Sequence, residues 1–315
     1  VHHSNLCSEI TLATNEERTA VCCLSSVNLE YYDEWSKVPA FIPDLIRMLD
    51  NVLTYFIENA PEQLERAKFS AMRERSLGLG AMGFHAYLQK NNMPFESVFA
   101  SSVNYEMFKY IKTLAQAETE RLAVERGACP DDDTCSVRNA HLLAVAPNAS
   151  SSIICGNTSP SIEPYRANAY TQKTKSGSHL QKNKYLEKVL EKYGRNDDNT
   201  WKSIVTNKGS CQHLEFLSDT EKEVFKTAVE INQSWVIEHA AQRQEFICQS
   251  QSVNLFFPPD VNKGELHNIH MLAWAKNMKT LYYLRSEAIS RADNVSNKIK
   301  REIIFEQQDC LSCEG

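Results

Sequence analysis

The sequence predicts an α/β fold, and three observations support this class. Stretches with the apolar period of helices alternate along the chain with short apolar stretches typical of strands. Of the 315 residues, 42% are hydrophobic and 23% are charged, which is ordinary for a globular protein with a large core. No internal repeat or low-complexity tract interrupts the alternation.

The overall charge excludes several classes of protein. Lys and Arg number 34 against 40 Asp and Glu, which gives a net charge of −6. This balance excludes a basic nucleic-acid scaffold, and the composition excludes a disordered acidic tail or a collagen-like repeat. No apolar run approaches the roughly 18 residues of a transmembrane helix, and no secretory leader opens the chain. We therefore expect a cytoplasmic protein without direct membrane or nucleic-acid binding. The first residue, Val1, indicates a fragment or a processed piece.

The first third of the chain combines extended and helical segments. Residues 6–27 are rich in Cys, Ser and Thr, which predicts two short extended pieces around a turn at residues 15–18. Residues 41–67 carry apolar side chains at helical spacing and predict a helix. Residues 74–89 contain three closely spaced glycines, a pattern that suits the tightly packed start of another helix.

The middle of the chain runs from a helix through a strand into a loop. Residues 101–126 predict a long amphipathic helix that ends at Gly127. Residues 141–146 predict a strand that stops at Pro147. Residues 148–170 are rich in Ser, Asn and Pro and predict a loop system.

The last third predicts three helices and two strands: helices at residues 182–193, 218–239 and 266–276, and strands at residues 252–257 and 279–284. Ser218 is the expected N-cap of the second helix, and two prolines close the first strand. The tail loses all periodicity. We therefore divide the chain into a folded domain, residues 1–290, and a flexible tail, residues 291–315.

Ten cysteines are unusual in a chain that otherwise looks cytosolic. The first lies in the motif Asn5-Leu6-Cys7-Ser8-Glu9. If this segment is extended, alternate side chains share a face, so Asn5, Cys7 and Glu9 present an amide, a thiol and a carboxylate together. Such a set suits nucleophilic and acid–base chemistry. The alternative is that Cys7 is a small buried apolar residue between solvated neighbours.

Two further pairs of cysteines stand out. Cys22 and Cys23 are adjacent, so on a strand at most one of them faces the site of Cys7; both could also be core residues. Cys310 and Cys313 form a CxxC pair at the end of the chain. A mobile dithiol can take part in thiol–disulfide exchange. The competing interpretation is half of a zinc site, whose second half is hard to find because Cys129 and Cys135 have the wrong spacing.

Two other motifs have both a chemical and a structural interpretation. The run Pro147-Asn148-Ala149-Ser150-Ser151 leaves a strand with small polar residues, which can make an anion site or simply a Ser-rich loop. Tyr282 and Tyr283 lie together in a short apolar stretch. They can be core aromatic residues, or a stacked pair that relays an electron and a proton.

Taken in order along the chain, these motifs resemble the large (catalytic, alpha) subunit of class I ribonucleotide reductase. Residues 75–80, 152–164 and 249–255 fit the same family. The resemblance covers essentially the whole chain, and its combination of motifs is specific. It implies the C-terminal half of a ten-stranded α/β barrel, beginning at the finger loop that carries the radical cysteine into the barrel.

The resemblance also implies a reaction, the radical-based reduction of a ribonucleoside diphosphate at C2′. Cys7 matches the thiyl radical that abstracts the 3′ hydrogen, and Glu9 the carboxylate that takes the 3′-hydroxyl proton. Asn5 matches the amide that holds the substrate hydroxyls. Cys22 matches one of the two thiols that reduce the 2′ position and close into a disulfide.

Further residues match the steps before and after this reaction. Tyr282 and Tyr283 match the relay that receives the radical from a metal-containing small subunit. Cys310 and Cys313 match the tail dithiol that re-reduces the active-site disulfide and is recycled by thioredoxin or glutaredoxin. The implied substrate-binding residues are Asn5, Leu6, Cys7, Ser8, Glu9, Pro147, Asn148, Ala149, Ser150 and Ser151.

The resemblance assigns no metal or cofactor to this chain. The thiol partner of Cys22 and the ATP and deoxynucleotide effector sites are expected upstream of Val1, on an N-terminal half. Expected partners are that half, the small subunit and a second large subunit, in the cytoplasm or in the host cytoplasm if the source is a virus. Cys22 is favoured over Cys23 as the redox thiol because it keeps the Cys-x-Leu-Ser spacing of the family.

Three alternatives remain beside this interpretation. The chain could be a split-gene or remnant half that acts only when assembled with an N-terminal half. It could be a structural protein that binds zinc through its tail cysteines. The third alternative is a cobalamin-dependent source of the radical. The tyrosine pair argues against it, because the pair indicates a separate radical-generating subunit.

Overall fold

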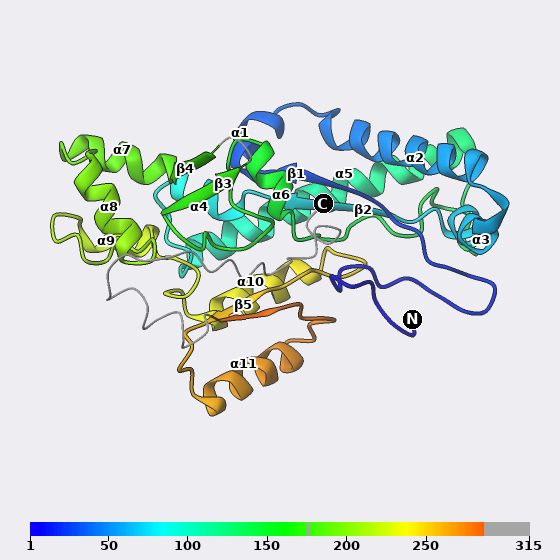
Figure 1. Cartoon of the computed structure of the whole chain (residues 1–315). Helices are drawn as coiled ribbons and strands as arrows, with labels where there is room; N and C mark the ends of the chain where they lie inside the picture. The colour runs from blue at the N-terminus through cyan, green and yellow to red at the C-terminus, as the bar shows by residue number, and fades with distance from the viewer. Residues whose placement is uncertain (175–176, 287–315) are drawn as a thin grey trace.

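The computed structural model describes residues 1–174 and 177–286 (Figure 1). Its helices and strands, in chain order, are β1 (Cys23–Asn28), η1 (Leu29–Tyr31), α1 (Tyr32–Trp35), α2 (Phe41–Asn59), η2 (Glu62–Leu64), α3 (Glu65–Glu74), β2 (Leu77–Met82), α4 (Phe84–Lys90), α5 (Val98–Arg126), α6 (Ala149–Ile154), β3 (Ala169–Thr174), β4 (Gly177–Lys182), α7 (Lys184–Lys192), α8 (Asp198–Thr206), α9 (Asp219–Val224), α10 (Gln233–Gln244), β5 (Leu255–Phe257), α11 (Lys263–Ala275) and β6 (Leu284–Ser286).

Parallel pairing connects five extended segments, which are β1, β2, residues 141–146, residues 251–257 with β5, and β6. β1 pairs with β2, and Leu79 of β2 pairs in parallel with Leu143. Val145 then pairs with Gln251, and β5 pairs with β6. Parallel strands need long crossover connections, and helices supply most of them here. The order of pairing agrees with the expected α/β class.

The main core lies between these strands and the helices that cover them. α2 and α5 pack against each other, and α10 contacts both α5 and α11 (Figure 1). α2 presents Ile46, Leu49 and Leu53 to the core at the spacing of one helical face. This confirms a helix at the start of residues 41–67, although η2 and α3 follow α2 as separate elements.

The glycine-rich stretch predicted as a helix start is instead the buried strand β2. A Cβ atom at Gly80 would lie 2.6 Å from the carbonyl oxygen of Ala144 on the neighbouring segment. Glycine is therefore needed because the backbones approach too closely for a side chain. The helix that was expected begins only after the strand, with α4.

A second core, not foreseen from the sequence, is built by the β3–β4 hairpin and by α7, α8 and α9. Trp201, Leu186 and Phe225 are buried in it. These three helices gather at one end of the molecule (Figure 1). The predicted helix at residues 182–193 is confirmed as α7, whereas the hairpin and α8 were missed.

Several other boundaries differ from the predictions. The turn at residues 15–18 is confirmed, since Asn15 and Arg18 exchange two backbone hydrogen bonds of 3.3 Å. The helix expected at residues 218–239 is two helices, because the carboxylate of Glu230 accepts from Thr227 N and closes a separate turn between α9 and α10. Residues 148–170 contain α6 rather than loop alone, and β6 starts at the end of the strand expected at residues 279–284.

In the part of the chain that the structure describes, none of the helices combines the length and the apolar character needed to span a membrane.

Candidate active site

Residues 5–9 form a turn, named the finger turn below, so the prediction of an extended segment is wrong. The backbone N–H of Ser8 donates to the carbonyl of Asn5 at 3.1 Å, and Ser8 has a φ of +65°. The side-chain oxygen of Asn5 accepts from Ile10 N at 3.1 Å and closes the loop. The turn exposes Leu6 and buries Cys7 and Glu9, whose side chains are 6% and 2% exposed.

The hydroxyl of Ser252 brings Cys7 and Glu9 together. Its oxygen lies 2.6 Å from the Cys7 carbonyl and 3.0 Å from Glu9 Oε2. Ser250 N donates to the Glu9 carbonyl at 2.9 Å. Thr280 Oγ1 donates to the Ser8 carbonyl at 2.9 Å from the other side. Two parallel segments, residues 250–252 and 280–282, therefore fix the turn and its buried carboxylate.

The tyrosine pair reaches the thiol of this turn. Cys7 Sγ and Tyr282 Oη are 3.4 Å apart, although 275 positions separate the two residues in sequence. The rings of Tyr282 and Tyr283 lie 4.0 Å apart between centroids, tilted by 36°. Burial, with hydrogen bonds to Cys7 and Tyr283, raises the pKa of Tyr282. Because Tyr283 is 43% exposed, the pair forms a contiguous path from the surface to the buried thiol.

Charged groups surround the outer tyrosine. The guanidinium of Arg285 lies 4.8 Å from the centroid of the Tyr283 ring. Asn254 accepts from Tyr283 N at 3.0 Å and donates through its amide nitrogen to the buried carboxylate of Glu163. Burial raises the pKa of Glu163 to about 7, while nearby Arg166 and the Asn254 hydrogen bond oppose that rise.

Cys22 and Cys23 point to opposite faces of the sheet. The side-chain amide of Gln249 donates to Cys22 Sγ at 3.2 Å, whereas Cys23 packs against the main apolar core. Burial raises the pKa of Cys22 to about 12, and the nearby carboxylate of Glu9 contributes to the same rise. Of the two thiols, Cys22 thus lies on the side of the finger turn.

The segment from Pro147 to Ser151 leaves residues 141–146 and enters α6. Asn148 adopts the left-handed conformation, with a φ of +54°, and its side-chain oxygen accepts from Ser26 on β1 at 2.9 Å. This bond places the segment beside β1, the strand that Cys22 precedes. In parallel sheets the carboxyl ends of the strands meet at one edge, where ligands bind.

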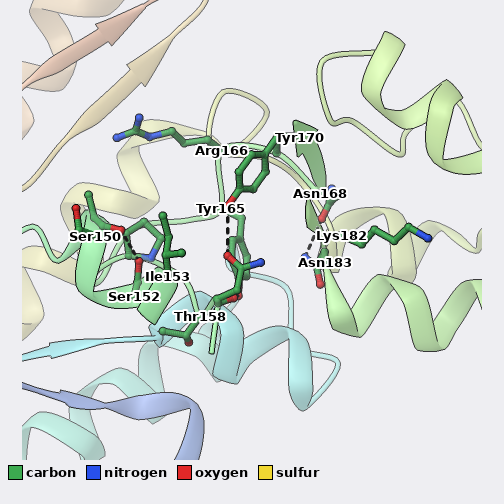
Figure 2. Close-up of a pocket in the computed structure, with 14 residues that line it drawn as sticks. Ser150, Ser152, Ile153, Thr158, Tyr165, Arg166, Asn168, Tyr170, Lys182 and Asn183 are labelled. Carbon is green, nitrogen blue, oxygen red and sulfur yellow. Dashed lines mark hydrogen bonds between the residues drawn. The ribbon is translucent and has the colours of Figure 1, made fainter. Parts of the chain in front are cut away.

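A cavity of about 420 Å³ lies between α6 and the base of the β3–β4 hairpin (Figure 2). Tyr165 and Tyr170 both donate to Asn157 across it, and Asn183 donates to Asn168. Ala149 and Ser150, at the start of α6, line this cavity, whereas Cys7, Glu9 and Cys22 do not.

Three residues around the turn were not predicted from the sequence: the buried Gln249 and Ser252, and the half-buried Thr280. Two of them lie in residues 249–255, one of the stretches that carry the family resemblance, and this was the one signal available. Among the described residues, no group of three His, Cys, Asp or Glu side chains could hold a metal ion. Cys310 and Cys313 lie outside the described residues.

Comparisons with known proteins identify the family. The profile described as "Ribonucleotide reductase, barrel domain" matches residues 1–136 and 133–284. The chain belongs to the ribonucleotide reductase barrel-domain family. This confirms the resemblance and the expected fold class, although the barrel is not closed by the strands of the described residues.

Relatives within the family are similar along most of this chain. It is 52% identical over 295 residues to the ribonucleoside-diphosphate reductase large subunit of Invertebrate iridescent virus 6, covering 92% of this chain and 31% of the relative. The large subunit of Invertebrate iridescent virus 3 is 47% identical, over 100% of this chain and 50% of its own length. The chain thus spans half or less of these two curated relatives.

A solved structure of the family has the same fold. The alpha subunit of the class Id ribonucleotide reductase of Actinobacillus ureae superimposes with a TM-score of 0.86 at 42% sequence identity. The match covers 91% of this chain and 54% of the solved chain. The five parallel segments of this chain therefore correspond to part of a ribonucleotide reductase barrel.

Proposed function

We propose that this chain is the catalytic part of a ribonucleoside-diphosphate reductase large subunit. Such an enzyme reduces ribonucleoside diphosphates to deoxyribonucleoside diphosphates for DNA synthesis. The observation that carries the proposal is the contact between Cys7 Sγ and Tyr282 Oη at 3.4 Å. A buried thiol that meets a stacked tyrosine pair has the parts needed to receive a radical and to shield it from water.

The residues of the turn have distinct proposed roles. A Cys7 thiyl radical takes the 3′ hydrogen of the substrate and becomes a thiol, which leaves the radical on C3′. Glu9 accepts the proton of the 3′ hydroxyl, and Asn5 holds the substrate hydroxyls. The burial of Glu9 and its bond to Ser252 support this assignment, because a base must keep a fixed geometry to act.

The reducing electrons are proposed to come from Cys22 and a second thiol. The 2′ hydroxyl leaves as water, two electrons pass from the thiols to the substrate, and the thiols close into a disulfide. The contact of Cys22 Sγ with Gln249, while Cys23 packs against the main apolar core, supports Cys22 over Cys23 for this role. The proposed partner thiol belongs to an N-terminal half of the subunit.

The substrate diphosphate is proposed to bind at the segment formed by Pro147, Asn148, Ala149, Ser150 and Ser151. Its position beside β1, held by the bond between Ser26 and Asn148, supports this placement. Leu6 and Ser8 flank Cys7 and complete the proposed contacts with substrate. Proposed partners of the assembled enzyme are a metal-containing small subunit, a second large subunit, and thioredoxin or glutaredoxin. ATP and deoxynucleotide effectors are assigned to the N-terminal half.

The decisive test is Tyr282→Phe in the complete enzyme with its small subunit. Phenylalanine keeps the ring but cannot lose a phenolic proton, so turnover should fall to background while substrate binding persists. Tyr283→Phe should act in the same way. Tyr193→Phe is the matched control, because Tyr193 donates its hydroxyl to Glu221 in the region of the second core and should retain turnover. Wild-type turnover in Tyr282→Phe would contradict the relay.

A further inference from the structure

We propose that Gln249 is a positioning residue that orients the Cys22 thiol and favours its thiolate form. The proposal rests on the redox role of Cys22 proposed above, and it adds a residue that sets the reactivity of that thiol.

The side chain of Gln249 is fully buried and all its polar atoms have partners. The amide nitrogen donates to Leu77 O at 2.9 Å and to Cys22 Sγ at 3.2 Å. The amide oxygen accepts from Thr11 N at 3.4 Å. An amide group has two N–H donors, and both are used here.

These partners also fix which way the amide faces. A backbone carbonyl such as Leu77 O can only accept, and a backbone N–H such as that of Thr11 can only donate. Exchanging the nitrogen and oxygen of Gln249 would place two acceptors together and two donors together. An N–H bond of Gln249 is therefore aimed at the sulfur of Cys22.

The backbone of Gln249 is held as firmly as its side chain. Its N–H donates to Leu143 O at 3.2 Å, and its carbonyl accepts from Lys279 Nζ at 2.7 Å. The sulfur of Cys22 is also confined, since a Cβ atom at Gly78 would lie 2.9 Å from it. Gln249 thus connects three segments at one thiol: β2, the stretch after the finger turn, and the entry to β1.

The surroundings of Cys22 otherwise oppose its ionisation. Burial raises the pKa of Cys22 to about 12, and the charges of Cys23, Cys248 and Glu9 act in the same direction. The hydrogen bond from Gln249 acts in the opposite direction. A donor aimed at a buried thiolate stabilises the charged form more than the neutral one.

This contact matters when the Cys22 disulfide is reduced by a dithiol. The incoming thiolate forms a new S–S bond to the partner sulfur, and the old S–S bond breaks. Its electron pair leaves on Cys22 Sγ, which then takes up a proton. A thiol leaves faster when its thiolate is stabilised, so the N–H of Gln249 favours this step.

The test measures thiol reactivity in the 315-residue chain without any turnover. The rate of alkylation of Cys22 by iodoacetamide is followed by peptide mass spectrometry between pH 7 and 10. Gln249→Met keeps the approximate volume and removes both N–H donors. We expect alkylation of Cys22 to be about tenfold slower in this variant, because only the thiolate reacts and it loses a hydrogen bond.

The chain offers an internal control and a matched variant. Cys211 is a second thiol whose pKa burial raises to about 12, and it contacts Phe225 O rather than Gln249. Its rate should not change in Gln249→Met. Gln251 is equally buried on the same segment but bonds Arg243, so Gln251→Met should leave the Cys22 rate unaltered.

An unchanged or faster rate at Cys22 in Gln249→Met overturns the proposal. If that variant does not fold, Gln249→Glu preserves the shape and also removes the amide donors. We then expect slower alkylation at Cys22 and a pH profile displaced upwards, and an undisplaced profile counts against the proposal. The redox role of Cys22 is tested separately by turnover of Cys22→Ser in the complete enzyme, so the two failures are distinguishable.

Discussion

At the scale of single residues, Glu163 shows how the fold sets the charge beside the tyrosine pair. Its carboxylate is buried and receives a hydrogen bond from Asn254, which also accepts from the backbone of Tyr283. Arg285 covers the Tyr283 ring. The ionisation of Glu163 is thus connected through one amide to the proposed radical path.

The raised pKa of Glu163 predicts a specific pH dependence of stability. The group titrates at about 7 in the folded protein and near 4.5 when unperturbed. The folded state therefore keeps the proton to higher pH than the unfolded chain does. The stability from Glu163 is fully present below pH 4.5 and is lost as the pH rises through 7, by up to about 3 kcal/mol.

Glu163→Gln should remove this part of the pH dependence. We expect the free energy of unfolding, measured with urea at pH 4.5, 6 and 7.5, to fall less with rising pH in the variant than in the wild-type chain. Glu58→Gln is the control, since Glu58 is exposed on α2. Parallel stability curves for the wild type and Glu163→Gln would show that Glu163 titrates normally.

At the scale of elements, β2 is held by close approach of backbones rather than by side chains. Gly80 has no room for a Cβ atom beside the Ala144 carbonyl, and the two nearest atoms, Ala144 O and Val145 Cα, are backbone atoms that cannot rotate away. Overpacking of this kind typically costs about 1–3 kcal/mol. The glycines of β2 therefore specify the pairing of the central strands.

Gly80→Ala should lower the free energy of unfolding by about 1–3 kcal/mol, measured by urea denaturation. Gly264→Ala is the control, because a Cβ there would lie 3.1 Å from the side chain of Asn262 at an exposed helix start. We expect that variant to change stability by a few tenths of a kcal/mol at most. Equal stability of the two variants would contradict a steric requirement at Gly80.

The same strand explains where sequence reasoning about elements succeeded and where it failed. Long periodic segments such as α2 and α5 were predicted because their apolar faces are visible in the sequence. The glycines of β2 carry no periodicity, so the local pattern predicts the start of a helix there. Its identity depends on β1 and on residues 141–146, which lie far away in sequence. Tertiary pairing decides such segments, and local patterns do not record it.

The candidate site was predicted in a similarly uneven way. Cys7, Glu9, Cys22 and the tyrosine pair can be proposed from the sequence because they occur as motifs in a fixed order. The turn that holds Cys7 was missed, because it is stabilised by Ser252 and Thr280 from the other end of the chain. Residue types could be recognised from the sequence, whereas the side chains that position them could not.

At the scale of the whole molecule, the site is assembled from the two ends of the described chain. The finger turn lies in the first ten residues, and the tyrosine pair lies beyond residue 280, yet Cys7 and Tyr282 are in hydrogen-bond contact. The parallel order of the intervening strands is what brings them together. Any loss of that order would separate the proposed radical path from the thiol.

The position of Cys22 leads to a last prediction, about how electrons reach the site. Cys22 is half-buried and its sulfur contacts the buried amide of Gln249, so a whole protein has less access to this thiol than a small dithiol has. The proposed tail dithiol, Cys310 and Cys313, would carry electrons inward by thiol–disulfide exchange.

In the complete enzyme, Cys310→Ser should abolish turnover with thioredoxin. Turnover with dithiothreitol should persist, because a small dithiol can enter the site directly. Cys155→Ser, at an exposed cysteine after α6, should support turnover with both reductants. Unchanged thioredoxin-driven turnover in Cys310→Ser would exclude the tail as the carrier.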